Sequence, residues 1–167
     1  MTTGIRPGSE EDTGAKVKAY GATTLKGEHV VVEDGRTYLR FTGKKGVSLN
    51  IEVTDKGTAE MLARRAAESG PDGQLFPKVS DQSLREYSHT LDGGGFKTKD
   101  MRTALGTREA GDQVNTMPAP NNAKEYQKSV MAVAKRVAAR LGNTPTVALQ
   151  SYIHPCVFSA WRVSAGI

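Results

Sequence analysis

Residues 30–53 read VVVEDGRTYLRFTGKKGVSLNIEV. Apolar and polar side chains alternate along residues 47–53, which predicts a strand with one buried face. Asp34-Gly35 separates two runs rich in β-branched and aromatic residues, and this dipeptide is a strong signal for a two-residue hairpin turn. A second group of turn-forming residues, 43–46, precedes the alternating run. The sequence therefore predicts a small three-stranded antiparallel sheet between about Thr23 and Val53.

Helical composition dominates the sequence after the sheet. Gly, Pro or a capping residue bounds most of the segments, with Thr98 as one expected N-cap. We expect helices over residues 58–68, 81–91, 98–113 and 122–141. Before the sheet, residues 8–20 predict a loop or a short helix. Because the strands come first and the helices follow, the fold class is α+β, with a sheet region over 23–53 and a mainly α-helical region over 54–167.

The clearest helix is the one that Asn122 opens. Apolar residues recur along it at intervals of 4, 3, 4 and 4 positions, which predicts one buried face. These residues are Tyr126, Val130, Val133, Val137 and Leu141. Gly142 is expected to end this helix as a C-cap. Asn143 then predicts a new N-cap, and a last helical stretch runs through Tyr152 to about residue 162.

The composition excludes several classes of protein. The chain has 167 residues, 37% of them hydrophobic, which is enough for a core without disulfides, and Cys156 is its single cysteine. A secreted disulfide scaffold and a cysteine-based zinc site are therefore excluded. No apolar run reaches the roughly 18–20 residues that span a bilayer, and the N-terminus lacks the apolar segment of a signal peptide. We expect a cytoplasmic protein with no membrane contact.

Motifs of the common nucleotide and metal enzymes are absent from the sequence. It has no GxxxxGK(S/T) loop, no HExxH, no GxSxG and no dense cluster of Asp, Glu and His. Residues 93–95 (GGG) could cradle a phosphate, but a flexible loop is the simpler interpretation. We expect no metal and no cofactor. A net charge of +5, from 23 Lys and Arg against 18 Asp and Glu, mildly favours a polyanionic partner.

The remaining candidates for chemistry are polar residues near the predicted element boundaries. Taken singly, each has an ordinary structural interpretation. Lys44 could be a solvated turn residue and Arg102 a surface arginine. Asn143 could be a helix cap and Tyr152 a packed tyrosine. The long helix adds basic residues that form either a solvated face or one that contacts phosphates: Lys124, Lys128, Lys135, Arg136 and Arg140.

Together, these residue types fit phosphodiester chemistry. A tyrosine hydroxyl, with an ordinary pKa of about 10, is a poor nucleophile at neutral pH. Arginines around a phosphodiester stabilise the charge that builds on the non-bridging oxygens, and the hydroxyl can then attack phosphorus. A lysine on a mobile hairpin can protonate the departing ribose oxygen. Such an assembly needs no metal.

Five motifs follow one another in the order and spacing of a known family. They are residues 6–9 (RPGS), 20–30 (YGATTLKGEHV), 41–44 (FTGK), 99–103 (KDMRT) and 141–155 (LGNTPTVALQSYIHP). From Arg6 to Tyr152 the chain resembles the type IB DNA topoisomerases, specifically their bacterial and poxvirus branch. These enzymes share their fold and their tyrosine nucleophile with the tyrosine recombinases.

The resemblance implies a role for each matched residue. Tyr152 is the expected nucleophile and Lys44 the general acid. The residues expected to stabilise the transition state are Arg6, Arg102 and Asn143, the last standing where poxvirus members have His. We also expect contacts with the DNA backbone from five basic residues: Lys45, Lys99, Lys128, Lys135 and Arg136. His29 is left open between a backbone contact and a structural role.

The implied activity is relaxation of supercoiled double-stranded DNA without ATP or metal. One strand is cleaved, held through a 3′-phosphotyrosyl link, allowed to rotate and resealed. The protein is expected to be a monomer, bacterial and nucleoid-associated or phage-encoded. Family members carry an N-terminal DNA-gripping domain before the first arginine, whereas Arg6 stands almost at the start here. We therefore expect residues 1–167 to be the catalytic domain alone, either a fragment or a shortened relative.

Two alternatives stay open at this point. A tyrosine recombinase would share the fold and the nucleophile, but recombinases usually have His in the place of Lys99 and His or Trp in the place of Asn143. The second alternative is a non-catalytic DNA-binding module, a remnant that binds through the basic helix without cleaving.

Overall fold

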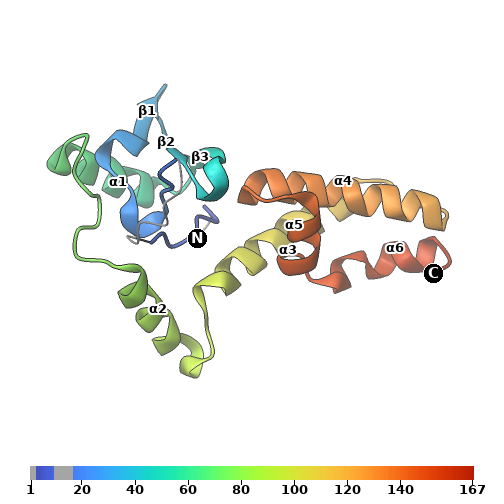
Figure 1. Cartoon of the computed structure of the whole chain (residues 1–167). Helices are drawn as coiled ribbons and strands as arrows, with labels where there is room; N and C mark the ends of the chain where they lie inside the picture. Colours follow the sequence, from blue (N-terminus) through green and yellow to red (C-terminus); the bar gives the residue numbers. More distant parts are fainter. Residues whose placement is uncertain (1–2, 10–16) are drawn as a thin grey trace. The chain divides into compact units, whose positions relative to one another are not determined.

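The computed structural model of the chain describes residues 3–9 and 17–167 (Figure 1). Residues 10–16 of the loop or short helix predicted from the sequence lie outside the described residues. The chain divides into two compact units, Met1–Thr98 and Lys99–Ile167. The first is called the sheet unit below and the second the helical unit.

The sheet has the predicted three-stranded antiparallel form. Its strands, paired in chain order, are β1 (Val30–Glu33), β2 (Arg36–Thr42) and β3 (Ser48–Val53). Asp34 and Gly35 join β1 to β2 with φ angles of 50° and 72°, the left-handed backbone that a type I′ hairpin turn requires. Leu39 stands opposite both Val30 and Ile51 in the register, so apolar residues of all three strands share one face.

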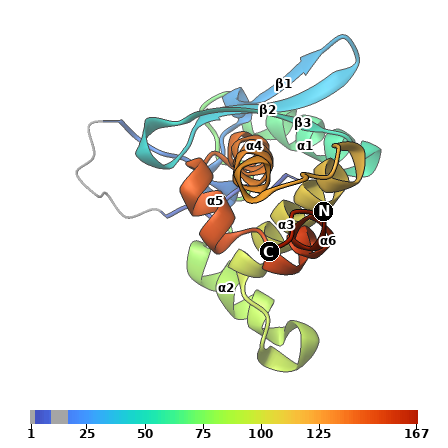
Figure 2. The same ribbon diagram turned by 90° about the vertical axis from the view of Figure 1, so that its right-hand side faces the viewer.

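Helix α1 (Lys56–Ser69) packs against this sheet (Figure 2). Asp55 caps its first turn by accepting the Thr58 N–H at 2.8 Å, and Gly70 ends it with a φ of 72°. The apolar core of the layer consists of Leu25, Leu39, Phe41, Ile51, Val53, Leu62 and Leu75. Helix α2 (Asp81–Thr90) follows in the same unit. The helices predicted over 58–68 and 81–91 are thus confirmed within a few residues.

The helical unit is built around the predicted long helix. Its elements are α3 (Thr98–Thr116), α4 (Ala123–Leu141), α5 (Pro145–Ser151), the 3-10 turn η5 (Pro155–Phe158) and α6 (Ser159–Ser164). The first residue of α3, Thr98, is the last residue of the sheet unit. Helices α4 and α5 lie side by side (Figures 1 and 2). Asn122 caps α4 by accepting the Glu125 N–H at 2.9 Å, and Gly142 ends it with a φ of 62°. The expected face is buried, apart from the half-buried Tyr126.

Two boundaries at α3 differ from the sequence prediction. Thr98 is the first helical residue and not the N-cap, and the helix continues past Gln113 to Thr116. Val114 and Met117 pack against the buried cluster of the helical unit, so packing extends the helix almost to the breaker Pro118.

The region around Tyr152 corrects two further predictions. Thr144, and not Asn143, is the N-cap of α5, because its hydroxyl accepts the Val147 N–H at 3.4 Å. The last helical stretch does not run through Tyr152. Helix α5 ends at Ser151, just before Tyr152. The 3-10 turn η5 begins at Pro155, and α6 follows it. Proline has no N–H to continue the helical ladder, which explains the interruption. Tyr152 is therefore a C-cap residue.

None of the helices in the described part of the chain is both long and apolar enough to cross a bilayer.

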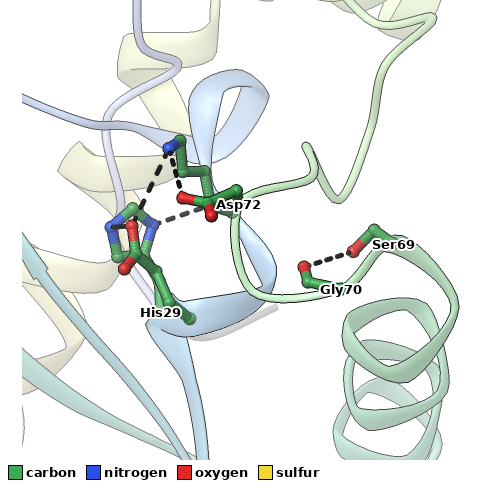
Figure 3. A network of polar contacts seen from close by, with 6 residues as sticks. His29, Ser69, Gly70 and Asp72 are labelled. Carbon is green, nitrogen blue, oxygen red and sulfur yellow. Dashed lines mark hydrogen bonds and ion pairs between the residues drawn. The ribbon is translucent and has the colours of Figure 1, made fainter.

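His29 is a buried structural residue of the sheet unit, only 7% exposed. Figure 3 shows its ring within a network of polar contacts. The Lys26 N–H donates to its Nδ1 at 2.9 Å, and the Glu28 carboxylate lies 3.8 Å from its Nε2. Its ring also packs edge-on against Tyr20, with 4.3 Å between ring centroids. Burial holds the pKa of His29 below its ordinary value of 6.5, Glu28 acts in the opposite direction, and Lys26 adds to the lowering.

Protonation of His29 is expected to destabilise the sheet unit. A lowered pKa means that the folded chain binds fewer protons than the unfolded one, so stability from this group is present above about pH 6.5 and is lost as the pH falls through the folded-state pKa. Protonation also removes the Nδ1 acceptor for Lys26. Urea denaturation should show that the free energy of unfolding falls between pH 7.5 and pH 5.0. In His29→Gln the slope of this free energy against pH should be smaller. The exposed control His89→Gln should keep the original slope.

Candidate active site

Arg102 lies on α3 and is buried in the helical unit, only 4% exposed. Its Nη2 donates to the carbonyl oxygen of Leu141 at 2.8 Å. Leu141 ends α4, and the last carbonyls of a helix have no partner within it. The guanidinium therefore joins α3 to the end of α4 and places a positive charge inside the unit. This position excludes the interpretation of Arg102 as an ordinary surface arginine.

Tyr152 is packed against cations. Its N–H donates to the Ala148 carbonyl at 3.0 Å, which closes α5. The Cζ of Arg102 lies 4.9 Å and the Nζ of Lys99 lies 5.6 Å from the centroid of the tyrosine ring. Both distances are within the range of cation–π attraction. The structure thus brings together three of the predicted site residues, two from the start of α3 and one from the end of α5.

Asn143 lies in the turn that joins α4 to α5. Its N–H donates to the Ala138 carbonyl at 2.9 Å, and the residue is half-buried. It stands two positions after Leu141, whose carbonyl accepts Arg102. With Thr144 capping α5, the Asn143 side chain is not required as the cap that the sequence suggested.

Arg6 belongs to the sheet unit, where the chain around it is fixed by backbone hydrogen bonds. Its carbonyl accepts the Ala22 N–H at 2.9 Å, and the next carbonyl, of Pro7, accepts the Thr23 N–H at 2.7 Å. The 3-10 turn η1 (Ala22–Thr24) therefore anchors this segment.

Lys44 and Lys45 are exposed in the 3-10 turn η3 (Lys44–Gly46), which connects β2 to β3. The Gly43 N–H donates to the Val47 carbonyl at 2.7 Å and closes the hairpin beneath them. The prediction that Lys44 stands on a turn between two strands is confirmed.

The basic residues of α4 occupy two different faces. Lys124, Lys128 and Lys135 are exposed and recur at intervals of 4 and 7, which places them on one stripe of the helix. Arg136 instead donates to the Gln113 side chain, and Arg140 lies 4.0 Å from the Glu109 carboxylate. Both arginines therefore link α4 to α3, so the lysine stripe is the better candidate for contacts with phosphates.

Two residues of α3 that the sequence analysis did not single out also contact the tyrosine segment. Thr107 is hydrogen-bonded to the backbone at Tyr152 and His154, and Gly106 packs directly against Tyr152. A glycine inside a predicted helix usually has a packing or functional reason, so Gly106 was the signal that could have found them.

Within residues 3–9 and 17–167, no three His, Cys, Asp or Glu side chains gather where they could hold a metal ion.

A small antiparallel sheet, followed by a helical unit that packs a tyrosine against a buried arginine, matches the features that the sequence shares with type IB topoisomerases. The model of the family described as eukaryotic DNA topoisomerase I, catalytic core, matches residues 2–159, and the chain belongs to this family. The resemblance found in the sequence is thereby confirmed.

Curated relatives agree with this assignment. The chain is 27% identical over 150 residues to DNA topoisomerase 1B of Acanthamoeba polyphaga mimivirus, covering 81% of this chain and 45% of the relative. It is 24% identical over 135 residues to DNA topoisomerase 1 of Rabbit fibroma virus (strain Kasza), covering 80% of this chain and 42% of that relative. The chain thus spans less than half the length of these relatives.

Replacing Arg102 is expected to destabilise the helical unit. Arg102→Ala leaves the Leu141 carbonyl without its donor in a buried place, which costs about 1–3 kcal/mol. Lys135→Ala, an exposed change on α4, should stay within about 0.5 kcal/mol of the original chain. Urea denaturation of the two variants measures the difference. Equal stabilities would contradict a structural role for the guanidinium.

Proposed function

We propose that this chain is the catalytic domain of a type IB DNA topoisomerase, which cleaves and reseals one strand of duplex DNA. The single observation that carries the proposal is the packing of Arg102 and Lys99 around the Tyr152 ring in a chain of this family. Relaxation of supercoils follows if the cleaved strand rotates before it is resealed.

The proposed reaction begins with attack of the Tyr152 hydroxyl oxygen on a backbone phosphorus, and the hydroxyl proton is lost to solvent. The new bond joins tyrosine to phosphorus, the bond from phosphorus to the ribose 5′-oxygen breaks, and a 3′-phosphotyrosyl link results. Resealing is the same exchange in reverse. Because one phosphoester replaces another, the bond energy is conserved and no ATP is consumed.

The other site residues are proposed to stabilise the charges that develop during this exchange. Arg6, Arg102 and Asn143 are proposed to donate to the non-bridging oxygens of the pentacoordinate phosphorus, where preorganised donors act most strongly. Lys44 is proposed to protonate the leaving 5′-oxygen. Each residue is carried over from the family motif, and the burial of Arg102 supports its part, since its charge is already desolvated beside the nucleophile.

The remaining basic residues are proposed to contact the DNA backbone. Lys45 and Lys99 flank the proposed general acid and second arginine in the sequence. On α4 the lysine stripe is the proposed contact surface, and Arg136 contributes there only if it leaves Gln113. The proposed place of action is the cytoplasm, with the protein acting as a monomer.

Tyr152→Phe is expected to abolish the covalent intermediate while the fold survives, because the ring that packs on Arg102 is kept. A duplex oligonucleotide is labelled on the part of the cleaved strand that stays attached to tyrosine through its 3′-phosphate. It is incubated with the protein in EDTA without ATP and run on a denaturing gel. The original chain and the exposed control Tyr87→Phe should give a covalent band, and Tyr152→Phe none. A band with Tyr152→Phe would assign the nucleophile elsewhere.

The same preparation separates the alternatives. A chain that binds duplex DNA but never forms the band is a non-catalytic module. If the band forms, relaxation of a supercoiled plasmid without recombination sites distinguishes a topoisomerase from a recombinase.

Lys44→Ala is expected to slow cleavage by about 100- to 10,000-fold, the usual contribution of a general acid. A substrate whose bridging 5′-oxygen is replaced by sulfur tests the role, since a thiolate leaves without a proton. Lys44→Ala should cleave the sulfur substrate almost as fast as the original chain does. Lys45→Ala serves as the comparison from the same turn and should show no selective rescue. Equal slowing of Lys44→Ala on both substrates removes the residue from the proposed role.

The lysine stripe is tested by the salt dependence of binding. Each phosphate contact contributes about 0.9 to the slope of log K against log salt concentration on B-form DNA. Lys128→Ala/Lys135→Ala should therefore lower the magnitude of the slope by about 1.8 for two contacts. Lys56→Ala/Lys78→Ala removes the same charge from exposed positions of the sheet unit. Equal slopes for the two double variants, measured by fluorescence anisotropy, would exclude the stripe as a contact surface.

A further inference from the structure

Thr107 connects α3 to the two residues around the end of α5. Its Oγ1 accepts the His154 N–H at 3.0 Å and donates to the Tyr152 carbonyl at 3.5 Å. One hydroxyl thus spans the turn that follows the tyrosine, from a position 45 residues earlier in the chain. The chain just after α5 has left the helical ladder, so this side chain supplies hydrogen bonds that the helix no longer provides.

Gly106 brings the α3 backbone against the same residue. A Cβ atom at Gly106 would lie 2.5 Å from the Tyr152 carbonyl oxygen, 3.2 Å from the Tyr152 Cβ and 3.3 Å from the Leu141 Cδ1. The first distance is far inside van der Waals contact, so any larger residue must displace the tyrosine backbone. The absence of a side chain at Gly106 therefore sets how closely Tyr152 approaches α3.

Both contacts act on the residue whose ring faces Arg102. Gly106 and Thr107 follow Arg102 by four and five positions on α3, so they and the guanidinium belong to one rigid helix. Ile153, between the two residues that Thr107 binds, is only 5% exposed and holds the turn in the core. The helix that supplies the cation thus also fixes the backbone of the tyrosine.

We propose that Gly106 and Thr107 are positioning residues, which hold the Tyr152 backbone so that its hydroxyl and the Arg102 guanidinium meet one phosphate in a fixed geometry. This inference rests on the proposed function. The two residues contact neither the substrate nor the reacting atoms. They act by fixing the position of Tyr152. A misplacement of about 1 Å can cost about 100-fold in rate, so a small loosening of this contact is enough to be measured.

Thr107→Val removes the hydroxyl and keeps the shape, while Thr107→Ser keeps the hydroxyl. The single-turnover rate of covalent adduct formation should fall by about 10- to 100-fold in Thr107→Val and stay within about threefold of the original in Thr107→Ser. Non-covalent DNA binding should be unchanged in both. The sulfur-bridged substrate should not rescue Thr107→Val, because the defect lies at the nucleophile. Thr116→Val makes the same exchange at an exposed site of α3 and should cleave normally.

A pair of glycine variants gives an independent test. Gly106→Ala should slow adduct formation by at least the same 10- to 100-fold, since the new methyl group must push Tyr152 away. Gly111→Ala is the matched control, because a Cβ at Gly111 meets nothing within 4 Å. All variants are compared at a temperature at which circular dichroism shows each to be fully folded.

Hydrogen exchange at the His154 amide separates this inference from the proposed function. The amide should be protected in the original chain and in Thr107→Ser and lose protection in Thr107→Val. If the original chain forms no adduct, the proposed function fails, while the exchange result still decides whether the Thr107 contact holds the turn. Normal cleavage by Thr107→Val, equal slowing of the Val and Ser variants, or retained protection of His154 in Thr107→Val would each overturn the inference.

Discussion

The buried guanidinium of Arg102 is the constraint on which the helical unit depends. It donates to the Leu141 carbonyl at 2.8 Å and lies 4.9 Å from the Tyr152 ring centroid. A cation without water must be compensated by hydrogen bonds and a favourable field, or it destabilises the fold. The end of α4 supplies the carbonyl and the ring supplies its electron-rich face. The contacts that make burial tolerable are therefore also those that place a charge beside the proposed nucleophile.

The sheet unit supports a different part of the proposed chemistry. Leu39 and Ile51 pack in the layer between strands and α1, and this rigid layer carries an exposed hairpin turn with Lys44. A general acid must approach the leaving group only when DNA is bound, so an exposed lysine on a short turn suits the task. The proposed nucleophile, Tyr152, is in contrast fixed by contacts inside the helical unit. The sheet unit thus offers an exposed lysine as the proposed acid, and the helical unit offers a closely packed tyrosine as the proposed nucleophile.

Local signals allowed much of the fold to be predicted. Asp34-Gly35 specifies its turn by backbone preference alone, and Asn122 and Gly142 mark the ends of α4 by capping chemistry. The N-cap of α5 was wrongly predicted to be Asn143, although Pro145 at the first helical position marks the preceding residue, Thr144, as the cap. The burial of Arg102 could not be predicted from the sequence, because the Leu141 carbonyl that it binds is 39 residues away. The family motif named Tyr152 and Arg102, but it could not show that Gly106 and Thr107 fix the tyrosine from α3.

The most direct test of the account is to map the residue that carries DNA after cleavage. The protein is trapped on an oligonucleotide, denatured and digested with trypsin, and the peptide bearing the 3′-phosphoryl nucleotide is sequenced by mass spectrometry. Tryptic cleavage after Arg140 and Arg162 gives a peptide, 141–162, in which Tyr152 is the single tyrosine. The account predicts that the nucleotide is attached to Tyr152 in this peptide. Attachment to any other residue, or a complete lack of attached nucleotide, would contradict it.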